Sequence, residues 1–142
     1  MKAISLWQPW ASLWLTPRKN YETRHWATRH RGWLAVHAAQ RFEKDHPPEL
    51  AEILRAQFGA DWYRTLPAGA IIGVVNVVGC FTTEEIVAYT HDDSDDLKCG
   101  DFSPGRFGWQ RGDDFKLLQN PIPYRGRQSI FSVPDALVMA HI

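Results

Sequence analysis

The pattern of hydrophobic and polar positions predicts a chain of many short strands with few helices between them. The clearest strand is the run 70–81, which is uncharged and rich in β-branched residues. Gly73 lies inside this run and marks the place for a bulge or a sharp bend. Shorter apolar runs predict further strands at residues 3–6, 32–37, about 106–109, 115–118 and 128–133.

Proline, glycine and a capping pattern delimit the predicted helices. Pro9 opens a short helix that ends near Thr16, and residues 47–58 form an amphipathic helix with Gly59 at its C-terminal end. Residues 82–85 (Thr-Thr-Glu-Glu) fit a capping box before a third helix, and a last one starts near residue 134. Segment 17–31 is polar and basic and is expected as a loop or edge segment.

These elements predict an α+β fold, a small bent β-barrel with flanking short helices. The chain has 142 residues with no internal repeat or linker, so a single domain over 1–142 is expected. No apolar run reaches the roughly 20 residues of a membrane-spanning helix, and the start of the chain is unlike a signal peptide. We therefore expect a cytoplasmic protein without membrane partners, in which Cys80 and Cys99 stay reduced.

The net charge is zero, but the charges are unevenly spread. Residues 1–41 carry +6, residues 42–101 carry −8 and residues 102–142 carry +2. The sequence can therefore present a basic face beside an acidic one, although solvated edges would give the same counts. The polar run 91–105 lacks calcium-loop spacing and is expected to be a solvated, mobile loop.

Tryptophan is unusually frequent, with seven residues of which five fall in the first 33. Such side chains serve as large core blocks or as stacking platforms. The sequence has no phosphate loop, dinucleotide fingerprint or common hydrolase motif, and its histidines do not fall into metal spacings. No metal and no cofactor is expected.

Three polar groups are candidates for a site. The first is Lys19, Tyr21, Glu22 and Arg24. If extended, the segment places Glu22 and Arg24 on one face and Lys19 and Tyr21 on the other, whereas a turn at Pro17 lets Lys19 fold back towards Glu22. A local ion pair is the alternative interpretation, contributing about 0–1 kcal/mol if exposed.

The second group is His37 at the end of a buried strand, followed by Arg41. A histidine in that position is more often a satisfied core residue than a functional one. The third is the glycine turn Tyr124-Arg125-Gly126-Arg127-Gln128. Its guanidinium groups suit phosphates and base edges, and an arginine-rich hairpin tip is the plain alternative.

Taken together, these segments resemble the ASCH (activating-signal-cointegrator homology) family of the PUA-like superfamily. The stretch Ile4-Ser5-Leu6-Trp7-Gln8-Pro9-Trp10-Ala11 resembles the opening of bacterial members, and Lys19-x-x-Glu22-x-Arg24 resembles the family signature GxKxxExR. Trp26, residues 32–39, Gly73, residues 107–109 and residues 121–128 resemble the later landmarks. Pro17 replaces the glycine of the signature.

The resemblance implies a PUA-like β-barrel whose cleft recognises RNA, single-stranded DNA or a modified nucleoside. It also implies an alternative, a small hydrolase acting on an N4-acylated cytidine-type nucleoside or on RNA. Glu22 would then be the base and Lys19 the electrophile. The amidohydrolase members carry Thr where this chain has Glu22, so their hydroxyl chemistry is not available at that position.

A binding module is the leading hypothesis. The expected contact residues are Trp7, Gln8, Lys19, Tyr21, Glu22, Arg24, Trp26, His37, Arg41, Arg125 and Gln128. A hydrolase should hold Lys19 and Glu22 within hydrogen-bond reach in a pocket for one base, whereas a binding module should show an open basic groove. A protein-interaction module that uses the acidic 92–96 stretch would leave the signature unexplained.

Overall fold

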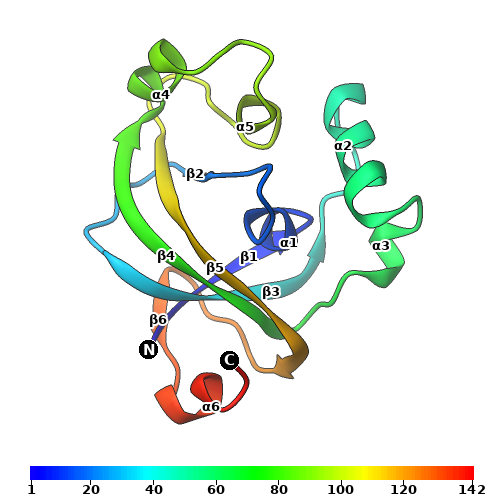
Figure 1. Cartoon of the computed structure of the whole chain (residues 1–142), viewed down its shortest axis with the longest axis vertical. Helices are drawn as coiled ribbons and strands as arrows, with labels where there is room; N and C mark the ends of the chain where they lie inside the picture. Colours follow the sequence, from blue (N-terminus) through cyan, green and yellow to red (C-terminus); the bar gives the residue numbers. More distant parts are fainter.

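The computed structural model describes residues 1–142, and its centre is a six-stranded sheet in the order β2-β5-β4-β3-β1-β6 (Figure 1). The strands are β1 (Lys2–Gln8), β2 (Tyr21–Arg24), β3 (Gly32–Phe42), β4 (Ala70–Thr82), β5 (Phe107–Pro123) and β6 (Ile130–Ser132). β1 and β3 run parallel, and every other pair of neighbours is antiparallel. The sheet is strongly bent and open between β2 and β6, and with its short helices it confirms the predicted α+β class.

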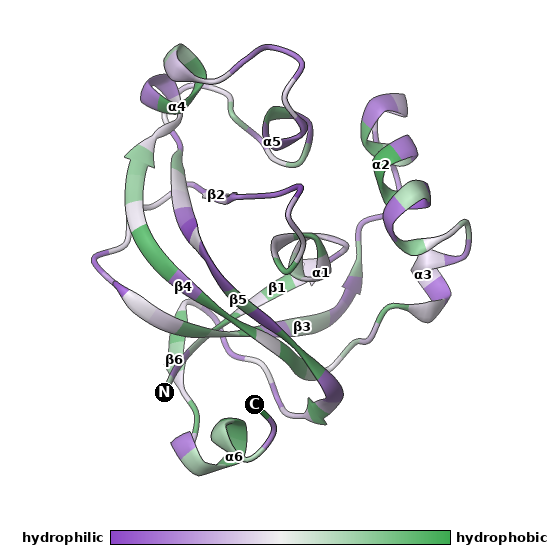
Figure 2. Cartoon of the chain, in the orientation of Figure 1, coloured by the Kyte–Doolittle hydropathy of each residue, from purple (hydrophilic) through white to green (hydrophobic).

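β4 confirms the strand predicted at 70–81. It is hydrophobic over most of its length, whereas β2 is hydrophilic (Figure 2). The register of β4 against β5 shifts between Ile71 and Gly73, as expected of a bulge. A Cβ atom on Gly73 would lie 2.6 Å from Leu15 Cδ1 and 2.6 Å from the Lys116 carbonyl oxygen. The glycine therefore lets the sheet bend where the chain after α1 packs against it.

The C-terminal half of the sheet differs from the prediction. The strands expected at 106–109 and 115–118 are one continuous strand, β5, and the strand expected at 128–133 is the shorter β6. Residues 112–114 (Gly-Asp-Asp) have no apolar side chain and therefore read as a break. Backbone pairing does not need apolar side chains, and register shifts against β4 absorb the irregularity.

Six helices flank the sheet: α1 (Trp10–Trp14), α2 (Pro48–Phe58), α3 (Trp62–Thr65), α4 (Thr83–Tyr89), α5 (Asp95–Lys98) and α6 (Asp135–Met139). The capping box predicted at the start of α4 is present, with Thr82 and Glu85 exchanging hydrogen bonds. Gly59 follows α2 with φ +91°, which favours glycine. In Figure 1, α4 and α5 lie near one end of β4, and α6 lies near both chain ends.

Alternation along the strands gives each face of the sheet a core cluster of its own, and a third cluster joins α1, α2 and α3. Val36, Ile72 and Val75 pack on one face of the sheet. Their partners there include the fully buried Trp14 of α1 and Trp109 of β5. Their neighbours along the strands form a second cluster on the other face, which includes Val138 of α6. β1 leads directly into α1, which packs on the first face. Side chains of β1, β2 and β3 line a cavity beside the start of this helix.

Candidate nucleic-acid or nucleoside site

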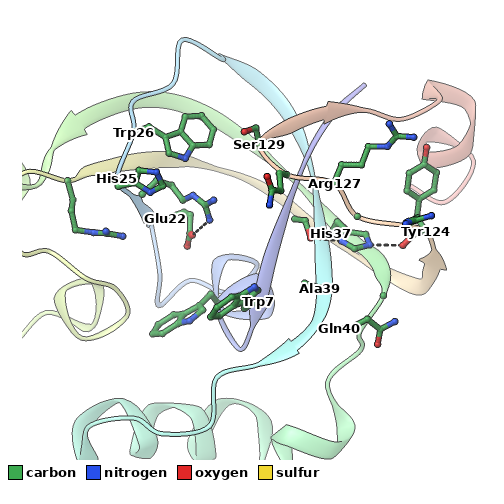
Figure 3. Close-up of a pocket in the computed structure, with 18 residues that line it drawn as sticks. Trp7, Glu22, His25, Trp26, His37, Ala39, Gln40, Tyr124, Arg127 and Ser129 are labelled. Carbon is green, nitrogen blue, oxygen red and sulfur yellow. Dashed lines mark hydrogen bonds and ion pairs between the residues drawn. The ribbon is translucent and has the colours of Figure 1, made fainter.

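A cavity of about 1280 Å³, here called the cleft, lies between β1, β2, β3, the start of α1 and segment 124–129 (Figure 3). Its lining includes a single carboxylate, that of Glu22. Four arginines line it: Arg24, Arg106, Arg125 and Arg127. Three tryptophans line it: Trp7, Trp10 and Trp26. The cleft exceeds the roughly 300–1,000 Å³ of most small-molecule pockets, and its charge is predominantly basic.

Glu22 is held between two cations. Its Oε1 lies 3.0 Å from Lys19 Nζ, and its Oε2 lies 3.6 Å from Arg24 Nη1. Glu22 and Arg24 share the cleft face of β2, as strand alternation predicts. Lys19 precedes the strand and folds back towards Glu22, which is the second of the two arrangements that the sequence allowed. Both side chains of the pair are almost fully buried, so neither can lose its partner without a large cost.

Lys19 makes all its polar contacts with the protein itself. Its Nζ donates a hydrogen bond of 2.7 Å to the Cys99 carbonyl and lies 4.9 Å from the centroid of the Trp10 ring. The side chain is 1% exposed and is not among those that line the cleft. In this arrangement Lys19 positions the Glu22 carboxylate from behind.

Part of the acidic run is held against the rest of the protein, whereas a solvated loop was expected; residues 91–93 are exposed as expected. Asp96 accepts hydrogen bonds from the backbone N–H of Asn20 at 2.6 Å and from its Nδ2 at 2.8 Å. Asp95 pairs with Arg18 at 3.2 Å, and Ser94 caps α5. Arg18 and Asn20 lie more than 70 residues away from these aspartates in the chain, so no local sequence pattern predicts the contacts. The run clamps the segment that carries Lys19.

Arg111 is a second support that the sequence did not reveal. The residue is 3% exposed, and its guanidinium donates to the carbonyls of Thr16 and Lys19 and to Asn20 Oδ1. No carboxylate pairs with it, and burial lowers its pKa, an effect that the negative charges of Asp96 and Asp113 oppose. Arg111 therefore fixes the backbone of residues 16–20, the segment that carries Lys19 of the signature.

His37 ties two parts of the cleft together. Its Nδ1 is 2.8 Å from Ser5 Oγ, and its Nε2 is 2.7 Å from the Tyr124 carbonyl oxygen. Because a carbonyl only accepts, Nε2 is the donor in the contact with Tyr124, and Nδ1 shares the remaining hydrogen bond with the Ser5 hydroxyl. A Cβ on Gly126 would lie 2.7 Å from His37 Cε1, so only glycine lets the backbone pass this close. His37 is 2% exposed, and the contacts anchor segment 124–129.

The tryptophans of the cleft differ in how freely they are presented. Trp7 is 43% exposed, and the Arg41 guanidinium lies 4.1 Å from its ring centroid. Arg41 itself is exposed and does not line the cleft. Trp26 packs edge-on against the buried Trp109, with ring centroids 4.7 Å apart. The aromatic surface of the cleft thus has one exposed platform and one anchored in the core.

Besides Lys19 and Arg41, two further expected contact residues, Gln8 and Tyr21, lie outside the cleft lining. Gln8 is fully buried and donates from Nε2 to Ser12 Oγ and to the Pro67 carbonyl. Tyr21 is half-buried on the other face of β2, and burial, with a smaller effect of Asp96, raises its pKa. The lining also contains residues that sequence reasoning missed, among them Ser5, His25, Gln40, Arg106 and Ser129. Figure 3 shows His25, Gln40 and Ser129 together with Arg127 of the predicted glycine turn. Alternation with Trp7 along β1 was the available signal for Ser5.

No group of three or more His, Cys, Asp or Glu side chains is arranged to hold a metal ion. No helix is long and apolar enough to cross a membrane. Both cysteines are free, and burial raises the pKa of the Cys99 thiol to about 11.

The fold is that of known ASCH proteins. The crystal structure of ASCH from Zymomonas mobilis superposes with a TM-score of 0.57 over 97% of this chain and 90% of that one, at 11% identity. A single-site variant of the same protein gives a TM-score of 0.57 over 98% and 94% of the two chains. At this identity the likeness concerns the fold alone, and it confirms the PUA-like architecture.

Comparison of the sequence with known proteins shows the family. The ASCH domain profile matches residues 4–94, and the chain belongs to the ASCH domain family. Activating signal cointegrator 1 from Homo sapiens is 34% identical over 89 residues, and the Mus musculus protein is 33% identical over 86 residues. These matches cover 58% of this chain and 15% of each relative, so the chain spans a small part of the length of both.

Proposed function

We propose that residues 1–142 form one ASCH domain that binds single-stranded nucleic acid, RNA above all, or a modified nucleoside in the cleft. The observation that carries the proposal is the gathering of four arginines and three tryptophans around a single carboxylate. The ASCH family is generally associated with RNA binding, which supports the same conclusion. The size of the cleft also favours a polymer or an extended ligand over one small base.

The chemistry of the lining suits the two kinds of surface that a nucleic acid presents. Arginine forks pair with phosphate oxygens, and stacking of one base on an aromatic ring contributes about 1–3 kcal/mol. Arg125, Arg127 and the nearby Arg41 are the proposed phosphate contacts. Arg24, next to Glu22, is a proposed donor to a base edge. Trp7 and Trp26 are the proposed stacking surfaces, and Gln128 is the proposed reader of a base edge. Gln8, Lys19, Tyr21 and His37 support this surface from beneath or beside it.

A second candidate function, hydrolysis of an acylated nucleoside or of RNA, is favoured by one observation. Lys19 Nζ and Glu22 Oε1 are 3.0 Å apart, the contact expected of a hydrolase. Glu22 would act as a general base on water. Because the Lys19 ammonium has no access to the cleft, its role would be to position Glu22, and an arginine would have to hold the developing negative charge.

Titration of labelled RNA, single-stranded DNA and duplex DNA at two salt concentrations tests the proposal. Single strands should bind more tightly than duplex, and Arg125→Ala should weaken binding and reduce the slope of log affinity against log salt by about 0.7. Trp26→Ala should weaken binding without changing that slope, because stacking releases no counterions. Trp33→Ala is the control, since Trp33 is 47% exposed and lies outside the cleft.

One result would reverse the order of the two candidates. If no nucleic acid bound at low salt, and Glu22→Gln abolished turnover of a small acylated nucleoside, the hydrolase would replace the binding module.

A further inference from the structure

Glu22 is the one negatively charged side chain in a cleft that four arginines line. A carboxylate only accepts hydrogen bonds, so it selects a ligand that offers donors. A cationic peptide would offer donors, but the surrounding guanidinium groups would repel it. A nucleotide combines an anionic phosphate with neutral N–H donors on its base, and it satisfies both requirements.

The bases differ in how many donors they can offer to one carboxylate. On its Watson–Crick edge, guanine carries two neighbouring donors, N1–H and the N2 amino group. Uracil carries a single N3–H there, and adenine and cytosine carry only an exocyclic amino group. The two oxygens of one carboxylate are therefore matched best by guanine, through two parallel hydrogen bonds.

Arg24 supplies the complementary donor. Its Nε is the one buried side-chain nitrogen or oxygen in the structure without a hydrogen-bond partner. Its Nη1 is 3.6 Å from Glu22 Oε2, a loose contact that leaves the guanidinium free to turn towards a ligand. The O6 atom of guanine is adjacent to N1–H, and it is one of the two guanine acceptors, O6 and N7, to which arginine commonly donates.

Aromatic rings flank this pair of charges. Figure 3 shows the Glu22 carboxylate pointing into the space that separates Trp26 from Trp7. The Arg24 guanidinium carbon lies 5.8 Å from the Trp26 ring centroid, so the donor and one stacking surface are adjacent. A base that reaches Glu22 edge-on therefore meets indole surface beside it.

We propose that the Glu22 end of the cleft selects an unpaired guanine. Glu22 accepts hydrogen bonds from N1–H and N2–H, Arg24 donates to O6, and Trp7 or Trp26 stacks on the ring. This inference rests on the proposed nucleic-acid binding and adds the base that the site prefers.

The test uses the full chain and labelled single-stranded hexamers of uridine in which one central position is guanosine, inosine, adenosine or cytidine. Inosine keeps N1–H and O6 and lacks only the N2 amino group. The guanosine oligomer should bind more tightly than the adenosine and cytidine oligomers by about 5- to 150-fold, the range for one good bidentate contact, with inosine in between. Because these ligands are compared on the unaltered chain, the result does not depend on the folding of any variant.

A matched pair of variants then assigns the preference to Glu22. Glu22→Gln, checked for folding by circular dichroism, should lose the preference for guanosine over inosine, because its amide offers one acceptor and one donor. Glu52→Gln removes the same charge from an exposed position on α2 and should keep the preference.

The outcomes separate this inference from the proposal on which it rests. Equal binding of all oligomers, or a preference for adenosine or cytidine, overturns the guanine site and leaves nucleic-acid binding in place. Absence of binding by every oligomer at low salt overturns both.

Discussion

The two ends of the cleft hold their polar side chains in different ways. At the β2 end, Glu22 is buried and its charge partner Lys19 is fixed from behind by the Cys99 carbonyl. At the other end, the side chains of Arg125, Arg127 and Gln128 are exposed. There, hydrogen bonds fix only the backbone: the Tyr124 N–H donates to the Gly69 carbonyl at 3.1 Å, and His37 holds the Tyr124 carbonyl.

This difference separates specificity from affinity. A buried, paired carboxylate meets its ligand in a fixed geometry, so a ligand with the wrong donors leaves polar groups unpaired. An exposed arginine must be ordered on binding, at about 0.5–1.5 kcal/mol for each long side chain, but it adapts to phosphates in different positions. The β2 end is therefore suited to choosing a ligand, and segment 124–129 to retaining one.

The largest effect is expected when the β2 end loses its buried cation. Lys19→Ala leaves the Glu22 carboxylate and the Cys99 carbonyl without their shared donor, so the free energy of unfolding should fall by about 3–5 kcal/mol. Urea denaturation measures this change. Lys116→Ala removes an exposed lysine and should alter stability by less than about 0.5 kcal/mol. Similar stability of the two variants would show that the pair does not organise this end.

Removal of the acidic clamp should have the next largest effect. Asp96→Ala deletes two hydrogen bonds to Asn20, one from its backbone N–H, and a bond to a charged group contributes about 1.5–3 kcal/mol. We expect a loss of stability in that range and weaker binding of single-stranded RNA. Asp92→Ala, in the same acidic run but exposed, is the control and should change neither. Equal effects of the two variants would mean that the run acts only through its overall charge.

The pH dependence of stability should also report on the β2 end. The pKa of Cys99 is raised from 9.0 to about 11 by burial, so between these pH values the folded chain keeps a proton that the unfolded chain has lost. The contribution is fully present below pH 9 and is lost as the pH rises towards 11, on the order of 2 kcal/mol. Urea denaturation from pH 8 to 11 should show a smaller decline for Cys99→Ser than for the unaltered chain. Parallel curves would count against a buried thiol.

The smallest effect on stability is expected at the other end. Arg127→Ala should leave the free energy of unfolding within about 0.5 kcal/mol of the unaltered chain, because the side chain is exposed. It should weaken RNA binding and reduce the salt slope by about 0.7, the share of one phosphate contact with a single strand. Arg29→Ala removes the same charge from an exposed position outside the cleft and should leave the slope unchanged. A slope altered equally by both would indicate diffuse electrostatics.

Local patterns predicted the elements whose cause is local. The β-branched run of β4, the bulge at Gly73 and the capping box at Thr82 each depend on residues that are adjacent in the sequence. The position of Glu22 and Arg24 on one face follows from strand alternation for the same reason.

Features that depend on distant partners could not be predicted in this way. Asp96 and Arg111 were ordinary charged residues in the sequence, and both meet the signature segment only after more than 70 residues of chain have folded between them. The burial of Lys19 depends on these contacts. The sequence therefore predicted a ligand-facing lysine, whereas the structure has a lysine that positions Glu22. The continuity of β5 was missed because pairing with β4, which lies elsewhere in the chain, maintains it.

The strand order has a consequence for the route by which the chain reaches this structure. β1 occupies the place between β3 and β6, so the first strand forms one pairing with residues 32–42 and the other only with residues 130–132. Contacts that join the two ends of a chain slow folding, because a long loop must close before they form. During synthesis one edge of β1 therefore stays without its partner until residues 130–132 have left the ribosome. An unpaired strand edge of this kind is open to aggregation during that interval.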